Sequence, residues 1–303
     1  MTPSVWSLLF WLGSTGQAQE TAEPPPDLIY FVLVDRFANG VEDTQDGIDT
    51  QDIQAFHGGD LQGIIDRLDH LQSMGIRTLW ISPVAQIQTE KIGPWGAYHG
   101  YWITDHQQVE PRFGDFETLA RLSTELHTRE MRLVLDMVYN HVGPSSSLVT
   151  EQPDWFHPTG DIVDWSDPVE RRTHRVHGLP DLDQDHPDVS QYLVDMTQSW
   201  LEKTGADGIR IDAIGHMEPR FVASLQSELR ERGHETWVLG EDFQGDPVAL
   251  EHQLGGVDAL VAHLVDLARD GDALGGLAEV GLLLDEEGRH VLVDRVRTLV
   301  GLD

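Results

Sequence analysis

Three acidic residues stand at the ends of short apolar runs, where their side chains could act in catalysis. Asp136 ends one run, Asp212 ends a second and Glu241 ends a third. An unpaired buried charge is costly, so carboxylates in such places are usually paired or functional. Two carboxylates on neighbouring strands suit glycoside hydrolysis, in which one attacks the anomeric carbon and the other protonates the leaving oxygen. Structural ion pairs and helix caps are the alternative for each residue.

Arg210 lies two residues before Asp212, so both side chains project from the same face of an extended strand. A guanidinium in that position would keep Asp212 ionised and ready to act as a nucleophile. Glu241 would instead have to carry a proton near neutral pH in order to act as a general acid. A plain structural pair between Arg210 and Asp212 remains the alternative.

The segments that must position these residues alternate between strand-like and helix-like patterns. Amphipathic helices are predicted over 60–71, 115–129 and 189–200 from their apolar spacing. Strands that are apolar on both faces and alternate with helices are typical of parallel sheets. Seven such strands favour an α/β fold of the (β/α)8 TIM barrel type, incomplete here, over a doubly wound sheet. The predicted strands are 28–34, 77–84, 132–138, 208–212, 236–241, 257–261 and 298–302.

Composition excludes several functional classes. The chain has 303 residues, no cysteine and a formal net charge of −32. Such a charge repels phosphates, so we expect neither nucleic-acid binding nor attachment to anionic membranes. Without cysteine there is no disulfide framework, no thiolate zinc site and no cysteine nucleophile. The acidity also raises the hypothesis of adaptation to salt.

The N-terminal region predicts export. Residues 1–18 are uncharged and contain a short apolar run followed by small residues, as a secretory signal peptide does. Residues 19–27 then form a proline-rich linker. We therefore expect a secreted or periplasmic protein whose catalytic barrel covers 28–303. Within it, 143–188 has little periodicity and interrupts the alternation as an inserted domain.

Six motifs, in order and in spacing, resemble those of the α-amylase family of glycosidases, which includes cyclomaltodextrinase-like enzymes. The resemblance implies the TIM barrel and identifies 143–188 as the domain B that the family inserts after strand three. The motifs occupy residues 58–63, 99–102, 136–141, 179–183, 208–216 and 240–241.

This resemblance implies a role for each matching position. Asp212 would be the nucleophile of a retaining mechanism, and Glu241 the general acid/base. A pyranose ring needs an aromatic face beside hydrogen-bonding groups, which agrees with the implied sugar subsite, although Tyr101 and Trp102 could be core aromatics instead. The implied substrate-binding residues are Tyr101, Trp102, Asp136, His141, Arg210 and His216.

The resemblance also implies Ca²⁺ as a cofactor, held by oxygen ligands. The main site would use Asn140, Asp181 and the backbone carbonyl of His216. A second calcium loop would use Asn39 and Asp60, with Asp43 nearby. Val41 stands there where an oxygen ligand is expected, and an ordinary Asx-rich turn is the alternative.

The implied activity is retaining hydrolysis of α-1,4-glucosidic bonds in starch-like glucans or maltooligosaccharides. Transglycosylation or action on cyclodextrins would use the same carboxylates. The family also uses a third Asp within an Asn-His-Asp motif after strand seven, and this chain contains no Asn-His-Asp. We therefore expect a fragment of a longer enzyme, with a non-catalytic carbohydrate-binding remnant as the alternative.

Overall fold

The computed structural model describes residues 28–41, 47–242, 259–262, 282–284 and 290–292. The predicted signal peptide, the linker, Asp43 and the strand over 298–302 lie outside these residues. The elements are β1 (Ile29–Val32), α1 (Val34–Phe37), α2 (Leu61–Ile65), α3 (Leu68–Ser73), β2 (Thr78–Ile81), β3 (Ala85–Ile87), β4 (Ile103–Val109), α4 (Phe116–His127), β5 (Arg132–Met137), α5 (Leu148–Glu151), η1 (Pro153–Trp155), α6 (Pro168–Thr173), α7 (Pro187–Thr204), β6 (Gly208–Ile211), η2 (Ile214–His216), α8 (Pro219–Glu231), β7 (Trp237–Asp242), β8 (Ala259–Ala262), β9 (Leu282–Leu284) and β10 (His290–Leu292).

The main sheet has six parallel strands in the order β1-β2-β5-β6-β7-β8, which is also their order along the chain. A doubly wound sheet reverses its strand order at a switch point, whereas a barrel adds each new strand beside the last. The strand order therefore confirms the barrel type of α/β fold. Among the described residues, the strands form part of a barrel and do not close into a ring.

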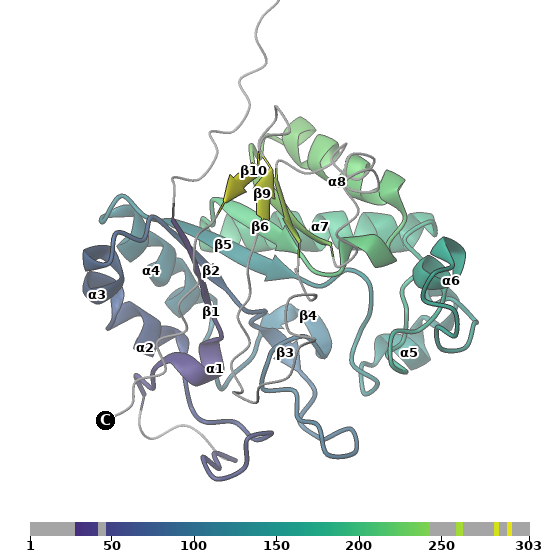
Figure 1. The fold of residues 1–303 in the computed structure, drawn as a ribbon, viewed down its shortest axis with the longest axis horizontal. Coiled ribbons are helices and arrows are strands. Elements are labelled where there is room, and N and C mark those ends of the chain that lie inside the picture. The colour runs from purple at the N-terminus through teal and green to yellow at the C-terminus, as the bar shows by residue number, and fades with distance from the viewer. Residues whose placement is uncertain (1–27, 42–46, 243–258, 263–281, 285–289, 293–303) are drawn as a thin grey trace, which may run out of the picture.

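The helices cover the sheet because their apolar side chains recur at helical spacing (Figure 1). On α7, Val189, Leu193, Met196 and Trp200 are buried, as the sequence pattern predicts. The helix expected over 60–71 is divided into α2 and α3, which are separated by the turn at Asp66 and Arg67. None of the described helices combines the length and apolar character that crossing a bilayer requires.

Two glycines allow the start of α2 to pack against α1 and the residue that follows α1, Ala38. A Cβ atom on Gly59 would lie 2.1 Å from the carbonyl oxygen of Val34, and one on Gly63 would lie 1.9 Å from that of Ala38. Any side chain at these positions would push the two segments apart. The motif over 58–63 therefore permits a close contact between two backbone segments. Within the motif, Asp60 caps α2 by accepting the Gly63 N–H at 2.6 Å.

Two parts of the chain depart from the strand–helix alternation. β3 and β4 form an antiparallel pair, which the apolar pattern did not predict. The segment 143–188, between β5 and α7, carries only α5, η1 and α6, and it lies at the right of the view in Figure 1. An isolated bridge between His141 and Asp181 ties this segment to the end of β5, and a second bridge, between Phe156 and Leu182, lies within the segment.

Candidate active site

The predicted catalytic residues lie at the carboxyl ends of β5, β6 and β7. Asp136 stands opposite Arg210 in the register between β5 and β6, and Asp212 and Glu241 follow at the ends of β6 and β7. In a parallel barrel, the carboxyl ends of the strands form the rim on which active sites are built. The register therefore brings side chains from three separate motifs to one place.

The guanidinium of Arg210 is the centre of this cluster. Its Nη1 atom donates to Asp136 Oδ1 at 2.7 Å and to Asp212 Oδ1 at 2.8 Å, and its Nη2 atom pairs with Glu241 Oε1. Arg210 is only 1% exposed, and all three carboxylates are buried. One buried cation thus holds the predicted nucleophile and the predicted general acid/base in a fixed relation.

The protonation of the cluster differs from the sequence expectation in one respect. Burial raises the pKa of Asp136 to about 6, although the nearby Arg210 opposes this shift. Burial likewise raises the pKa of Asp212 well above its usual value, with Arg210 acting against it and Glu241 adding to it. The expected ion pair between Arg210 and Asp212 is present. However, the cost of burying the carboxylate charge outweighs the stabilisation by Arg210. Because one guanidinium faces three carboxylates, the cluster as a whole favours the binding of a proton.

Asp136 is held by two further donors, one of which the sequence did not suggest. Trp80 donates from Nε1 to Asp136 Oδ2 at 3.0 Å, and the Tyr101 hydroxyl donates to the same oxygen at 2.9 Å. The guanidinium of Arg210 also lies 5.0 Å from the Trp80 ring centroid. The mid-strand Trp80 therefore positions both charged groups and belongs to the site.

His141 is a neutral imidazole in this environment. Burial lowers its pKa to about 4, so that its Nε2–H can donate to the Tyr101 carbonyl oxygen at 3.0 Å. Its other nitrogen, Nδ1, is buried and has no hydrogen-bond partner among the described residues. A neutral ring in this tautomer leaves Nδ1 as an acceptor for a hydroxyl group.

The turn after the predicted nucleophile is held in a strained conformation. Ala213 has φ +50°, which is uncommon for a residue with a Cβ atom, and its N–H donates to Glu241 Oε2 at 3.1 Å. This contact links the turn after β6 to the end of β7. Backbone strain of this kind persists only where the surroundings enforce it, and it often occurs at functional sites.

Among the other predicted substrate-binding residues, Tyr101 is hydrogen-bonded to Asp136, and Tyr101, Trp102 and His216 make further aromatic or backbone contacts. The Tyr101 ring stacks on His99 with centroids 5.6 Å apart, and Trp102 meets His99 edge-on at 5.0 Å. His216, in η2, faces the inserted segment, where its Nδ1 atom lies 3.0 Å from the Arg171 carbonyl oxygen. In the chain, Tyr101 and Trp102 precede β4, and His216 follows β6.

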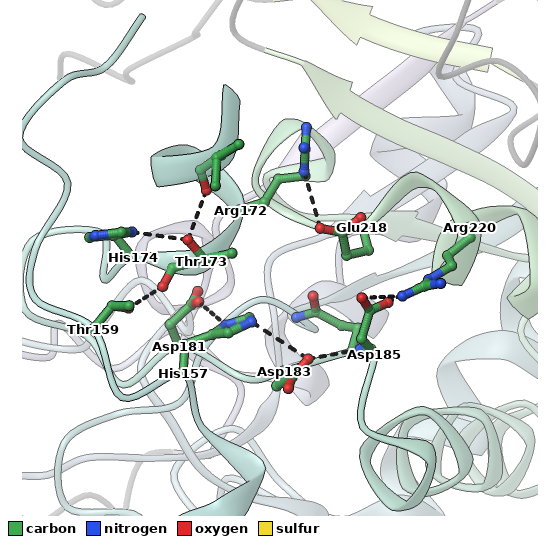
Figure 2. Close-up of polar contacts among 12 residues, drawn as sticks. His157, Thr159, Arg172, Thr173, His174, Asp181, Asp183, Asp185, Glu218 and Arg220 are labelled. Carbon is green, nitrogen blue, oxygen red and sulfur yellow. Dashed lines mark hydrogen bonds and ion pairs between the residues drawn. The ribbon is translucent and has the colours of Figure 1, made fainter. Parts of the chain in front are cut away.

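The side-chain oxygens at the main predicted calcium site have the chemistry that a calcium ion requires. Asn140 Oδ1 and Asp181 Oδ1 are both buried and have no hydrogen-bond partner among the described residues. Oxygen atoms left unpaired in this way are costly unless a ligand satisfies them, and Ca²⁺ prefers such oxygens. His157 fixes the other oxygen of Asp181 through an Nδ1 contact of 2.7 Å, and its Nε2 lies 3.5 Å from Asp183 (Figure 2). No group of three or more His, Asp or Glu in the described chain could hold a metal by itself.

The second predicted calcium loop has other partners. The carboxylate of Asp60 accepts backbone N–H groups from Gly40, Val41 and Gly63 at 2.6–3.1 Å. Asn39 Oδ1 accepts the N–H of Val41 at 3.0 Å. Both side chains therefore serve as turn and helix caps in this structure, which is the arrangement of the Asx-rich turn.

Comparison with known proteins gives a family for most of the described chain. Residues 31–240 match the model of the alpha amylase catalytic domain. The chain is 32% identical over 247 residues to a cyclomaltodextrin glucanotransferase of Klebsiella oxytoca, covering 73% of this chain and 37% of that protein. It is 34% identical over 232 residues to alpha-amylase 2 of Schwanniomyces occidentalis, covering 72% and 45%. The chain thus spans less than half the length of these relatives.

Solved structures give the same fold. The alpha-amylase of Geobacillus thermoleovorans, complexed with acarbose, superposes with a TM-score of 0.70 at 36% identity, covering 77% of this chain and 50% of that one. An alpha-amylase of Anoxybacillus superposes with a TM-score of 0.73 at 38% identity, covering 77% and 51%.

Proposed function

Since the chain belongs to the alpha-amylase family, we propose that its protein is a retaining glycoside hydrolase that cleaves α-1,4-glucosidic bonds in starch-like glucans or maltooligosaccharides. The observation that carries this proposal is the buried cluster of Asp212 and Glu241 around Arg210. Two carboxylates on adjacent strand ends, fixed by one guanidinium, meet the needs of a two-step displacement.

In the first step, a carboxylate oxygen of Asp212 forms a bond to the anomeric carbon while the glycosidic C–O bond breaks. Glu241 gives its proton to the departing oxygen, so the leaving sugar is released as an alcohol. In the second step, Glu241 takes a proton from water as that water attacks the same carbon and breaks the ester to Asp212. The anomeric configuration is therefore retained after two inversions.

The surrounding groups suit a sugar ring. Tyr101 offers an aromatic ring, and the acceptor atom Nδ1 of His141 could take a hydrogen bond from a sugar hydroxyl. Asp136 holds Arg210 through an ion pair and Tyr101 through a hydrogen bond. We assign Trp102 and His216 to flanking parts of the same site.

Transfer to a sugar hydroxyl is the second candidate, because a cyclomaltodextrin glucanotransferase is among the similar proteins. A sugar hydroxyl would replace water in the second step, with Asp212 and Glu241 in the same roles. Which acceptor prevails depends on how well the site holds a second sugar. We also propose export, for which the uncharged residues 1–18 are the support.

The deciding experiment is incubation of the protein with maltoheptaose, with the products followed by chromatography and by NMR of the anomeric protons. We expect shorter maltooligosaccharides whose new reducing ends are first formed as the α-anomer. Products longer than maltoheptaose would favour transfer. Initial release of the β-anomer would contradict the retaining mechanism, and the absence of any cleavage would contradict the function.

Calcium would be held by Asn140, Asp181 and the His216 carbonyl, and it would join the inserted segment to the barrel. We expect chelation by EGTA to lower the melting temperature by about 5–10 °C, since a ligand at 100 times its Kd stabilises the fold by about 2.7 kcal/mol. Calorimetry with and without EGTA measures this. Asn140→Ala should abolish the effect of EGTA, whereas Asn39→Ala should retain it because Asn39 lies in the capped turn. Equal melting curves with and without EGTA would exclude the site.

A further inference from the structure

Trp80 occupies the third position of β2, and its indole packs among the strands that carry the candidate active site. The side chain is only 8% exposed, and it lies against Phe31 of β1 with ring centroids 4.4 Å apart. Val134 of β5 and Trp237 of β7 belong to the same small core cluster. For this packing alone, other large apolar side chains would serve nearly as well as tryptophan.

The indole N–H distinguishes Trp80 from a plain core residue, because it donates to Asp136 Oδ2 at 3.0 Å. The Tyr101 hydroxyl donates to the same oxygen, and Arg210 Nη1 donates to Oδ1 at 2.7 Å. A tyrosine hydroxyl can also accept a hydrogen bond, whereas an indole N–H and a guanidinium can only donate. A proton placed on Asp136 would therefore meet two groups that cannot accept it.

The charged and titratable groups around Asp136 limit where a proton can go. They are Arg210 and Asp212 from β6, Glu241 from β7, His106 from β4, Tyr101 before β4 and Tyr139 after β5. Burial lowers the pKa of His106 to about 4 and raises the pKa of both tyrosines, so these three groups are neutral near neutral pH. Within this set, the proton that the cluster binds is thus shared among the three carboxylates.

The place of that proton decides whether the cluster can react. Glu241 must hold a proton in order to give it to the departing oxygen. Asp136 must stay ionised in order to hold Arg210 and Tyr101. Because burial raises the pKa of Asp136 to about 6, Asp136 competes with Glu241 for the shared proton.

We propose that Trp80 is a positioning residue that keeps the shared proton off Asp136 and leaves it to Asp212 and Glu241, the two carboxylates that react. The proposal rests on the proposed hydrolysis of α-1,4-glucans. Trp80 acts through Asp136, because its N–H contacts that carboxylate rather than either reacting one. A hydrogen bond to the ionised form of a carboxylate favours that form.

The test compares the pH profile of kcat/KM on maltoheptaose in the wild type and in Trp80→Phe, which keeps an aromatic ring but has no N–H. This profile reports the free enzyme. A hydrogen bond to a charged group changes a pKa by about one to two units. Losing the donor raises the pKa of Asp136, and activity falls as the pH drops through it. We therefore expect the acidic limb to move about one unit to higher pH.

A titration that does not depend on activity accompanies the kinetics. In protein labelled with carbon-13 at the aspartate carboxyl groups, the NMR signal of Asp136 is identified by its absence from Asp136→Asn. This signal should titrate at a higher pH in Trp80→Phe than in the wild type. Trp80→Met also lacks the N–H and gives the same comparison if Trp80→Phe does not fold.

The matched control is Trp200→Phe, which makes the same chemical change at another buried tryptophan. Trp200 donates from Nε1 to the His106 carbonyl oxygen at 2.7 Å, so its loss removes a hydrogen bond without touching a carboxylate. We expect this variant to leave the acidic limb and the Asp136 signal where they are in the wild type.

The outcomes separate the two proposals. If the wild type is active and Trp80→Phe changes neither the acidic limb nor the Asp136 signal, the role of Trp80 is wrong and the proposed function stands. A limb that moves while the Asp136 signal does not would also overturn this role, because the effect would not pass through Asp136. If the wild type cleaves no maltoheptaose at any pH, the proposed function is wrong, and the NMR titration alone decides whether Trp80 keeps the proton off Asp136.

Discussion

Replacing Asp212 by Asn should lower kcat on maltoheptaose about 10⁴-fold or more, because an amide cannot form the glycosyl ester. The side chain keeps its size, and its amide oxygen can still accept from Arg210 Nη1, which lies 2.8 Å from the carboxylate in the native protein. We therefore expect the variant to fold and to bind substrate. Steady-state kinetics, with binding followed separately by calorimetry, measures the effect.

The matched control is Asp69→Asn, which makes the same chemical change at an exposed site. Asp69 pairs with Arg129 at the surface, so its loss should leave kcat within about twofold of the wild type. If Asp212→Asn retained more than 1% of wild-type activity, another residue would be the nucleophile. A large loss in Asp69→Asn would mean that surface charge, rather than chemistry, controls the rate.

Replacing Arg210 by Met should destabilise the protein by about 3–5 kcal/mol at pH 8, as expected when one partner of a buried ion pair is removed. The variant leaves Asp136, Asp212 and Glu241 buried without their common cation. Folding raises the pKa of Asp136 and of Asp212. A carboxyl group of this kind makes the folded protein less stable as the pH rises through its pKa. The destabilisation should therefore shrink at pH 5, where more of these groups are protonated.

Urea denaturation at pH 5 and pH 8 measures this difference. Arg129→Met serves as control, because Arg129 pairs with Asp69 and Glu125 at the surface, and its loss should cost only about 1 kcal/mol at either pH. An Arg210→Met variant with the same destabilisation at both pH values would show that the carboxylates do not depend on Arg210. Adding Asp136→Asn to Arg210→Met should recover part of the stability at pH 8.

The sequence predicted the main strands well because burial on both faces leaves an unmistakable apolar run. β2 and β5 lie within the predicted segments, and β6 and β7 agree to within one residue at each end. The antiparallel pair β3 and β4 was missed because polar residues such as Gln86 and His106 interrupt its pattern. α8 was also missed, although Phe221 and Leu225 lie at helical spacing.

The sequence predicted that the candidate residues stand at the ends of strands, but it did not predict the contacts between them. Spacing along one strand was enough to pair Arg210 with Asp212. The contacts of Arg210 with Asp136 and Glu241 depend on the register between strands, which no local pattern contains. The role of Trp80 had one signal, since a buried indole N–H needs an acceptor and the neighbouring side chains of Leu79 and Ile81 are apolar.

The depth of burial was the other quantity that local patterns did not contain. The pairing of Arg210 with Asp212 suggested an ionised carboxylate, but the side chains packed around both groups determine the cost of the charge. Likewise, the sequence offered two roles for Asp60, a metal ligand or part of an Asx-rich turn, and no local pattern contains the close approach permitted by Gly63, which brings backbone N–H groups to the Asp60 carboxylate.

The agreement between strand order in the sheet and strand order in the chain has a consequence for synthesis on the ribosome. Each new strand finds its partner in the one made just before it, so the sheet can grow from its first edge while translation continues. Asp136 and Arg210 both leave the ribosome before Glu241, which follows Arg210 by 31 residues, or about 2–6 s of elongation. The nascent chain can therefore neutralise its buried cation with Asp136 and Asp212 before the last carboxylate arrives.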